Sequence, residues 1–561
     1  MPSVDYSRYY VFSELVTTLQ DFAREYANLA ELSSLGKSYE GRDLWLLTLT
    51  NRETGAAADK PAFWLDANIH ATEVSGSMAA LHLIDTLLAG YGSDPQATRL
   101  LDTSVLYILP RMNPDGAERG LTTPYGIRSS VRHYPRTERL DGLYAEDVNG
   151  DGIILTMRQI DPNGDWRISE QDPRVMVKRR PDEAGGTYYR IYPEGLILNY
   201  DGVNVKMSPA LEGLDINRNF PGQWRPEAEQ RGAGPYPTSE PEIRAVVQFL
   251  TDHPEIHGAI TYHTYSGAIL RPHSGKPDEE FAPHDLAVYK AIGDRGTELT
   301  GYPNISVFHD FRYDDKEVIS GVFDDWAYDH LGIFAFTVEL WDIVGEAGIK
   351  ERKFIEWMKN HGEEDDHKLM RWNDEHAADG TGFIDWQPFE HPQLGPVDIG
   401  GWHPIYGFRN PPPSMLLDTC QRNTKFAMAH MAMAPLLRVS ALGAEALGGG
   451  LYRVRAIVQN EGFLPTYGSA QAKQRRACRP LEARLALPEG AALELGERRQ
   501  EIDHLEGRSA RLGRWTNPET SDRTKLEWLV RAPAGGELAL AIAGGRGGTA
   551  RATVALPADH A

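Results

Sequence analysis

The stretch "WLDANIHATEVSG", residues 64–76, places His70 and Glu73 three residues apart, directly after a short apolar run. The run that leads into it, 61–70, leaves no room for a helix and is typical of a buried strand. The segment that follows, "SGSMAALHLIDTLLAGYG" (75–92), begins with Ser and ends in Gly, which predicts a helix. A His-x-x-Glu pair at such a turn can supply two ligands to one metal ion. It indicates a site only if a third ligand and a catalytic base exist elsewhere.

Composition limits the class of protein. A chain of 561 residues is expected to form two or more domains, and 41% hydrophobic with 25% charged residues is ordinary for a soluble globular protein. No apolar run reaches the roughly 18 to 20 residues that a membrane span needs. The 58 basic residues face 80 acidic ones, for a net charge of −22, so neither nucleic acid nor an anionic membrane is expected as the main partner.

Cysteine usage narrows the metal chemistry. The sequence has two cysteines, Cys420 and Cys478, which excludes a disulfide framework and a cysteine-based zinc cluster. A metal ion would therefore be held by histidines and carboxylates. The N-terminus, "MPSVDYSRYY", has neither the basic flank nor the apolar core of a signal peptide. Both features favour the cytoplasm, whereas a leader removed during processing would place the protein in the periplasm or outside the cell.

The first 434 residues alternate predicted strands and helices. The strands are continuous apolar runs, which indicates an α/β fold whose sheet is covered by helices on both faces. Residues 117–214 depart from this pattern, and we interpret them as a long insertion of loops and short hairpins on the rim of the sheet. The strands are expected at 43–50, 61–70, 104–116, 256–267 and 332–342, and helices at 11–32, 75–92 and 424–437.

From residue 435 the pattern changes. Runs such as "GLYRVRAIVQNEGFLP" and "GELALAIAGG" alternate roughly with period two and are broken by Gly and Pro. This pattern predicts an all-β sandwich. We therefore expect a catalytic domain over residues 1–434 and a β-sandwich accessory domain over 435–561.

Two further residues complete a candidate metal site. His263 interrupts the apolar run "ITYHTYSG", where an unpaired imidazole would be costly, so it is the preferred third ligand. A core histidine with a local hydrogen-bond partner is the alternative. Glu339 lies in the apolar run "FAFTVELWD", and a buried carboxylate near a cation can exchange a proton near neutral pH. Its alternative is a structural ion pair.

The segment "GLDINRNFPG", residues 213–222, supplies polar groups of another kind. Asp215, Asn217 and Arg218 lie close together before a Phe-Pro pair. Arginine suits bidentate capture of a carboxylate. A surface salt bridge, which would contribute little stability, is the alternative.

Five motifs in this order resemble the metallocarboxypeptidase family of the carboxypeptidase A type, the M14-like peptidases. Together they are far more specific than any one alone. They are His70-x-x-Glu73, "NPDG" at 113–116, "DINRN" at 215–219, "HTYS" at 263–266 and "FTVEL" at 336–340.

The resemblance implies a zinc exopeptidase that acts on peptides or proteins with a free C-terminal carboxylate. It implies a mixed, mostly eight-stranded sheet flanked by helices. The zinc ligands would be His70, Glu73 and His263, with Glu339 as general base. Asn217 and Arg218 would grip the terminal carboxylate, Asp215 would orient a ligand imidazole, and Tyr265 would line the substrate groove.

This chain departs from the family's pattern in three places. Thr72 stands where many members carry an arginine. The family's oxyanion-side arginine is displaced by the long insertion, and Arg158 is our candidate for it, with Arg180 and Arg190 as rivals. The family's mobile tyrosine aligns with Glu317, so Tyr313, four residues away, is our candidate for that role.

The same alignment predicts a substrate preference. Asp324 falls at the base of the family's specificity pocket, and an acid there favours basic C-terminal residues, because a desolvated Lys or Arg needs a charge partner. Asp325 matches an acid commonly found before Trp326, for which a structural role is expected. A slip of one residue in the alignment would place Phe323 in the pocket and make it apolar.

The insertion contains half of a calcium-loop motif. In "DVNGDGIIL", Asp147, Asn149 and Asp151 alternate before a glycine, as in the first half of an EF-hand loop. The twelfth position is Arg158 instead of glutamate, so the full loop fails. "DPNGDW" (161–166) repeats the acidic spacing. A structural calcium and a pair of Asx turns are both compatible with this segment.

Two other functions fit the same residues. An amidase or deacylase of this fold, acting on N-acyl amino acids or cell-wall peptides, would also use Asn217 and Arg218. A non-catalytic peptide-binding protein would be expected to have lost the base or a ligand, and here all four positions are filled.

Overall fold

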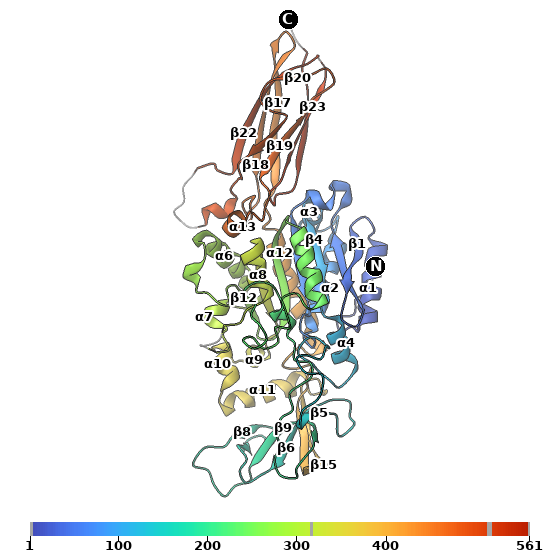
Figure 1. The fold of residues 1–561 in the computed structure, drawn as a ribbon, viewed down its shortest axis with the longest axis vertical. Coiled ribbons are helices and arrows are strands. Elements are labelled where there is room, and N and C mark those ends of the chain that lie inside the picture. Colours follow the sequence, from blue (N-terminus) through green and yellow to red (C-terminus); the bar gives the residue numbers. More distant parts are fainter. Residues whose placement is uncertain (1–3, 315–317, 513–518, 534, 559–561) are drawn as a thin grey trace.

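The computed structural model describes residues 4–314, 318–512, 519–533 and 535–558. Its centre is a mixed eight-stranded sheet flanked by helices, as predicted, with strand order β1-β2-β4-β3-β11-β14-β12-β13 (Figure 1). The strands are β1 (Ala30–Lys37), β2 (Asp43–Leu49), β3 (Ala62–Ala67), β4 (Val105–Leu109), β11 (Ile256–Thr264), β12 (Ala268–Arg271), β13 (Asn304–Ser306) and β14 (Phe334–Leu340).

Helices bury both faces of this sheet. In β3 alternate side chains enter opposite cores: Phe63 and Leu65 enter one, and Ala62 and Trp64 enter the other. This two-sided burial explains why the strands read as continuous apolar runs. One core includes α1 (Phe12–Glu25), α2 (Ser75–Gly90), α3 (Pro95–Thr103), α4 (Pro114–Thr122), α6 (Pro283–Thr300) and α12 (Pro413–Met431), and the other includes α5 (Pro241–Asp252) and α8 (Phe323–Leu331).

The first predicted helix is shorter than expected. We predicted a helix over 11–32, but α1 ends at Glu25 and residues 30–37 form β1, which pairs antiparallel with β2. Pairing with β2 fixes this segment as a strand, so tertiary context overrides its local helical pattern.

The parallel strands bring their C-terminal ends to one edge of the sheet. β3, β11 and β14 are neighbours and run parallel, and His263 on β11 pairs in register with Glu339 on β14. Gly76, in the first turn of α2, lets that helix approach closely: a Cβ there would lie 3.0 Å from Cβ of Tyr262 and 3.1 Å from Cβ of Ala67. The turn between β3 and α2 is thereby held beside the end of β11.

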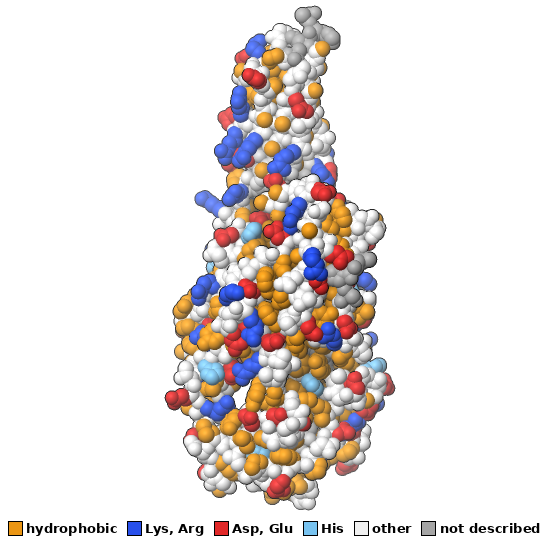
Figure 2. All heavy atoms as spheres, turned by 90° about the vertical axis from the view of Figure 1, so that its right-hand side faces the viewer, with side chains coloured by type: hydrophobic (Ala, Val, Ile, Leu, Met, Phe, Trp, Pro, Cys, Tyr) orange, Lys and Arg blue, Asp and Glu red, His pale blue; other side chains and the backbone are white. Residues whose placement is uncertain are grey.

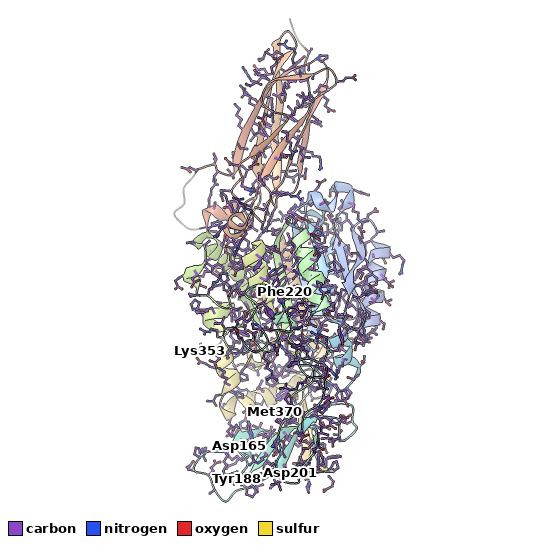
Figure 3. All side chains as sticks on the ribbon, in the orientation of Figure 1. Asp165, Tyr188, Asp201, Phe220, Lys353 and Met370 are labelled. Carbon is purple, nitrogen blue, oxygen red and sulfur yellow. The ribbon has the colours of Figure 1, made fainter. Side chains whose placement is uncertain are left out.

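The insertion leaves and re-enters the catalytic core at one narrow point. The backbone amide of Tyr134 donates to Leu211 O at 2.9 Å, and that of Gly213 donates to Tyr134 O at 3.0 Å. Beyond this point the chain forms short strands at the end of the molecule opposite the C-terminal domain, where Figure 3 labels Asp165, Tyr188 and Asp201. These strands are β5 (Gly142–Ala145), β6 (Thr156–Ile160), β7 (Trp166–Ile168), β8 (Met176–Lys178), β9 (Tyr189–Pro193) and β10 (Gly195–Leu198).

A distant hairpin completes the sheet of the insertion. β15 (Phe383–His391) and β16 (Gly395–Trp402), which we did not predict, pair in the order β15-β16-β6-β9-β7-β8. β5 and β10 form a separate pair. The insertion is therefore built from two parts of the chain and shares a small core that includes Met157 and Ile399.

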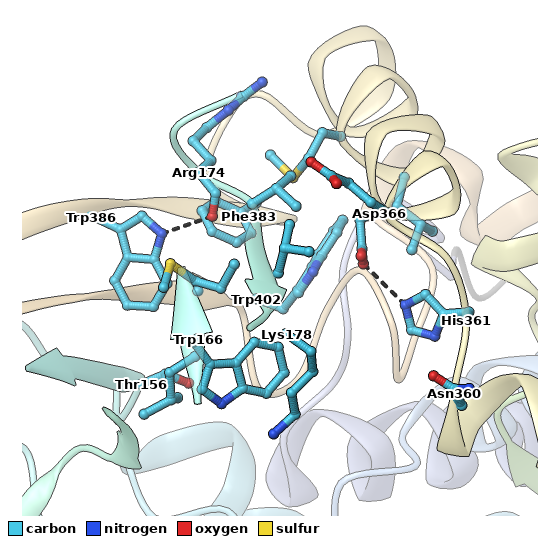
Figure 4. Close-up of a pocket in the computed structure, with 18 of the residues that line it drawn as sticks. Thr156, Trp166, Arg174, Lys178, Asn360, His361, Asp366, Phe383, Trp386 and Trp402 are labelled. Carbon is cyan, nitrogen blue, oxygen red and sulfur yellow. Dashed lines mark hydrogen bonds and ion pairs between the residues drawn. The ribbon is translucent and has the colours of Figure 1, made fainter. Parts of the chain in front are cut away.

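A cavity of about 540 Å³ lies between this sheet and the helices α10 (Phe354–Lys359) and α11 (Glu363–His376) (Figure 4). Three tryptophans line it: Trp166, Trp386 and Trp402. Nε1 of Trp386 donates to Arg174 O at 2.9 Å. The short helices α7 (Val307–Asp310) and α9 (Ile343–Glu346) belong to two smaller cores, which also include Ile355 of α10 and Leu369 of α11.

The C-terminal part is all β, as predicted, and projects from the catalytic part (Figure 1). Two four-stranded sheets, β17-β18-β22-β20 and β21-β19-β23-β24, enclose one core with Trp528 fully buried. The expected boundary at 434/435 falls between α12 and β17. The strands are β17 (Leu437–Gly448), β18 (Leu451–Asn460), β19 (Leu481–Ala486), β20 (Ala492–Leu495), β21 (Arg499–Ile502), β22 (Arg523–Arg531), β23 (Glu537–Ala543) and β24 (Ala550–Ala555), with helix α13 (Ala470–Arg475) between β18 and β19.

Arg546 fastens the two parts together. It is 1% exposed, and its guanidinium donates to the carbonyls of Gly332, at 2.7 Å, and Leu331 at the end of α8. A cation at a helix C-terminus satisfies carbonyls that lack partners within the helix. Burial lowers the pKa of Arg546 to about 10, which leaves it charged at neutral pH.

On the face drawn in Figure 2, basic and acidic side chains are interspersed over both parts of the molecule, and neither charge covers a large continuous area. Across the described ranges, none of the helices combines the length and the apolar character needed to cross a bilayer.

Candidate metal centre and active site

His70, Glu73 and His263 converge at the C-terminal edge of the central sheet. Their candidate ligand atoms all lie within 4.8 Å of one another, and each residue is at most 3% exposed. Nδ1 of His263 lies 3.1 Å from Nδ1 of His70 and 3.2 Å from Oε2 of Glu73. Two imidazole nitrogens and one carboxylate facing a common point are the donor set of a catalytic zinc site. The residues present therefore fit the zinc ion that the sequence implies.

The local sequence shapes the turn that carries two of these groups. Asn68, with φ of 62°, turns the chain at the end of β3, and its Nδ2 donates to His70 O at 2.6 Å. Asn tolerates this left-handed conformation better than most residues. Oε2 of Glu73 accepts the backbone N–H of Thr264 at 3.1 Å, which ties the ligand to the end of β11.

The protonation states also suit a cation. Burial raises the pKa of Glu73, but His70 and His263 outweigh it and hold the pKa well below its ordinary value. Burial lowers the pKa of His263. An ionised carboxylate and a neutral imidazole are the forms that bind metal.

Asp215 lies where the sequence predicted a group that orients a ligand imidazole. Its Oδ1 lies 3.1 Å from Nε2 of His70, opposite the ring nitrogen that faces the cluster. Such a carboxylate fixes the tautomer and the orientation of a metal-binding histidine. Burial raises the pKa of Asp215, but Arg128, Arg218 and His70 together keep it well below its ordinary value.

Arg128, which sequence reasoning missed, lies within hydrogen-bond distance of the cluster. Its Nη1 lies 3.2 Å from Oε1 of Glu73, and its Nε lies 3.1 Å from Oδ2 of Asp215. The available signal was its position: Arg128 precedes the narrow point at Tyr134 where the insertion departs. Arg128 lies within the predicted insertion of residues 117–214, but the chain passes the cluster there before it leaves the central domain at Tyr134.

The placement of Arg158 at the cluster is therefore corrected. Its guanidinium belongs to the insertion sheet, where Nε donates to Asp398 at 2.9 Å and Nη1 to Pro173 O at 3.2 Å. Register explains this, because Arg158 on β6 pairs with Asp398 on β16. The rivals Arg180 and Arg190 also pair within the insertion, with Glu183 and Asp161.

Glu339 is a partly buried carboxylate at the same edge of the sheet. Among the described residues, its Oε2 has no hydrogen-bond partner. Burial and the nearby charge of Glu73 raise its pKa well above the ordinary value, while Arg128 and Arg409 act in the opposite direction. It is thus an unengaged proton acceptor beside the cluster.

The predicted substrate-binding residues surround this edge. Nη1 of Arg218 donates to Asn217 O at 2.7 Å, and Oδ1 of Asn217 accepts the N–H of Phe323 at 3.0 Å, at the start of α8. Tyr313 is 51% exposed. Partial desolvation and the charge of Glu339 raise its pKa, against Arg128 and Arg218, so its phenol lies within electrostatic reach of the cluster. Glu317, with which the family's tyrosine aligns, lies outside the described residues.

Tyr265 joins the cluster to the cavity of Figure 4. Burial raises the pKa of Tyr265, and Glu339 adds to the effect. Its ring lies 5.9 Å from that of Phe408, which in turn lies 4.8 Å from that of Trp402 in the cavity wall. The Trp402 side of the cavity is thus continuous with the aromatic residues beside the metal ligands.

The two adjacent acids of α8 differ in their surroundings. Both oxygens of Asp325 accept the N–H of Ser274 at 3.0 Å, as expected for a structural acid. Asp324 is 3% exposed and forms no ion pair with any described residue. Burial raises the pKa of Asp324 to about 6.

The residues of the calcium motif form a network of turns. Asp147 accepts the N–H groups of Gly150 and Gly152, and Asn149 accepts that of Asp151, all between 2.7 and 2.9 Å. Oδ1 of Asp151 accepts the N–H of Ile153 at 2.9 Å. These bonds are those of Asx turns. Calcium binding stays a prediction.

An α/β sheet with a buried His/Glu/His cluster and an unengaged carboxylate at its C-terminal edge defines a mononuclear metallohydrolase. The chain belongs to the zinc carboxypeptidase family Peptidase_M14, whose match spans residues 15–355. Residues 436–555 match a domain of unknown function, DUF8731.

Similar proteins bear the family's name. The chain is 28% identical to carboxypeptidase A2 of Rattus norvegicus over 347 residues, which are 60% of this chain and 64% of that protein. It is 25% identical to carboxypeptidase A6 of Homo sapiens over 341 residues, 60% and 61% of the two chains. The chain thus spans less than two thirds of the length of these relatives. The crystal structure of thrombin activatable fibrinolysis inhibitor matches with a TM-score of 0.44 and 20% identity, over 76% of this chain and 75% of that one.

Proposed function

We propose that the protein is a zinc-dependent carboxypeptidase that removes C-terminal residues from peptides or proteins. The observation that carries the proposal is Glu339, a partly buried carboxylate beside the His70–Glu73–His263 cluster, whose buried Oε2 has no hydrogen-bond partner among the described residues. In a protein of this fold that had lost catalysis and only bound peptides, a buried carboxylate oxygen without a hydrogen bond would cost stability and serve no purpose.

Each residue at the edge of the sheet has a role in this reaction. Zinc, when bound, would polarise the scissile carbonyl and make the attacking water more acidic. Glu339 accepts the proton of that water and delivers it to the leaving amine. Arg128 donates to the oxygen on which negative charge develops, as a preorganised cation in a buried site can. Asp215 keeps His70 in the correct tautomer.

Arg218 and Asn217 would bind the terminal carboxylate of the substrate. Arginine offers two parallel N–H donors that match a carboxylate. Because Asn217 also receives the N–H of Phe323, this pair is fixed relative to α8 and to Asp324.

The first prediction tests the exopeptidase activity. In a mixed peptide pool followed by mass spectrometry, free-acid peptides should lose C-terminal residues one at a time, and a chelator should stop the reaction. Arg218→Ala should lower kcat/KM for free-acid substrates about 10- to 100-fold, since it removes a charged hydrogen bond, and should affect amidated ones far less. Equal losses on both would show that Arg218 is structural and would refute the exopeptidase proposal.

We further propose that the enzyme prefers basic C-terminal residues. Asp324 supports this proposal, because it is a buried acid that forms no ion pair among the described residues, although Thr337 and the charge of His273 lower its pKa. Burial and the charge of Asp324 also raise the pKa of Asp325 well above its ordinary value, because two adjacent buried acids repel each other. A lysine or arginine side chain of the substrate would supply the missing partner.

The second prediction concerns this pocket. Wild type should favour C-terminal Arg over Phe in kcat/KM, and Asp324→Asn, a nearly isosteric change, should reduce that ratio about tenfold or more. Because the pKa of Asp324 is raised to about 6, the ratio should also fall as the pH drops from 8 towards 5 and the acid becomes neutral. A wild type that prefers Phe, or a ratio unchanged by the substitution, would exclude Asp324 as the determinant.

A further inference from the structure

Arg409 reaches the metal cluster from a part of the chain that no motif marked. It follows the hairpin β15–β16, and its Nη1 lies 3.8 Å from Oε1 of Glu73. Its charge also acts on Glu339 and on Tyr265. A third arginine, besides Arg128 and Arg218, therefore faces the site.

The segment around Arg409 is firmly anchored on both sides. Before it, Nε1 of Trp341 donates to Gly407 O at 2.6 Å. After it, Asn410 is fully buried: its Oδ1 accepts the N–H of Ser75 at 2.9 Å and its Nδ2 donates to Thr72 O at 2.7 Å. The segment is thus tied to both chain segments that carry Glu73 and Glu339, and this fixes the backbone of Arg409 relative to the reacting groups.

The guanidinium of Arg409 is not engaged in hydrogen bonds that stabilise the fold. Its side chain is 34% exposed, and within the part of the chain that the structure describes it donates no hydrogen bond. A contact of 3.8 Å to Glu73 is looser than a charge-assisted hydrogen bond, which spans about 2.7 to 2.9 Å. Glu73 is also a candidate metal ligand, so its charge would be shared with a cation. Arg409 therefore keeps N–H donors that are partly exposed and that a substrate could engage.

The position of Arg409 indicates which part of a substrate it meets. Arg218 approaches the cluster beside Asp215 and Asn217, whereas Arg409 approaches it beside Glu73 and Tyr265. Arg128 contacts both Glu73 and Asp215 and so lies between these two arginines. If Arg218 holds the terminal carboxylate and Arg128 the scissile carbonyl, the upstream part of the peptide extends towards Arg409. This step rests on the proposed function.

We propose that Arg409 donates to the carbonyl oxygen of the peptide group immediately upstream of the scissile bond. Arginine suits this task because its planar donors keep their charge at any physiological pH. The enzyme would then be adapted to peptides of at least three residues, or to acylated dipeptides, and would handle N-acyl amino acids poorly.

Two substrates of equal length test the proposal. Benzoyl-glycyl-arginine has the upstream carbonyl, and phenylbutanoyl-arginine replaces that amide by methylene groups. Arg409→Ala should lower kcat/KM for the first about 10- to 100-fold and for the second by less than about threefold. Arg180→Ala, which removes an exposed arginine of the insertion, is the matched control and should change neither. The corresponding phenylalanine substrates serve if the wild type prefers Phe.

A binding measurement separates this proposal from the proposed function. In Glu339→Gln protein, calorimetry should show that Arg409→Ala weakens benzoyl-glycyl-arginine by a similar factor but leaves phenylbutanoyl-arginine unchanged. If Arg409→Ala weakens both ligands equally, Arg409 acts through Glu73. If it weakens neither ligand, Arg409 does not contact the substrate. Either result overturns the proposal. If wild type hydrolyses neither compound, the carboxypeptidase proposal fails, while the ratio of the dissociation constants still decides the role of Arg409.

Discussion

Glu339→Gln is expected to keep the metal and to lower kcat by about 10²- to 10⁴-fold. The amide has nearly the same shape as the carboxylate, but it cannot accept the proton of the attacking water. KM should change little, because Glu339 makes no contact that holds the terminal carboxylate. The measurement is steady-state kinetics on a free-acid substrate, together with the zinc content of both proteins.

Three readings of that experiment are distinguishable. Loss of activity with full zinc content supports Glu339 as the base. Loss of both activity and zinc would mean that Glu339 supports the cluster. Its charge interaction with Glu73 makes such a role possible. Turnover near that of the wild type would place the base elsewhere and would contradict the mechanism. Asp325→Asn is a useful comparison, because it also neutralises a buried acid but one bound to the backbone of Ser274.

The central sheet and the metal cluster could be predicted because their signals are local. Continuous apolar strands follow from burial on both faces, as the split of Phe63 and Trp64 between two cores shows. His263 interrupts such a strand, so its position alone placed it at the edge of the sheet. The cluster then formed because β3 and β11 are parallel neighbours.

The pairings between distant segments could not be predicted. The sequences of β15 and β16 do not indicate that these strands complete the sheet of the insertion. The register between strands more than 200 residues apart depends on the folded core. The same hairpin leads into the segment that carries Arg409 to Glu73. Arg158 was misplaced for the same reason: it follows an apolar run, but its partner, Asp398, is supplied by β16.

Arg128→Ala should lower kcat about 10²- to 10³-fold, which is the usual cost of removing one donor to a developing oxyanion. Arg158→Ala is the matched control from within the chain. It removes an arginine that is more buried than Arg128 but bound to Asp398 in the insertion, so kcat should stay within about threefold of the wild type.

Arg128 also contacts Glu73 and Asp215, so its removal could act through the metal ligands instead of the substrate. Zinc content and the affinity for a free-acid product separate these effects. If Arg128 stabilises the transition state, both should stay near their wild-type values while kcat falls, because an interaction made only in the transition state leaves the ground state unchanged. A parallel loss of zinc would assign Arg128 to the support of Glu73. A larger loss of kcat in Arg158→Ala than in Arg128→Ala would restore the assignment made from the sequence, against the geometry.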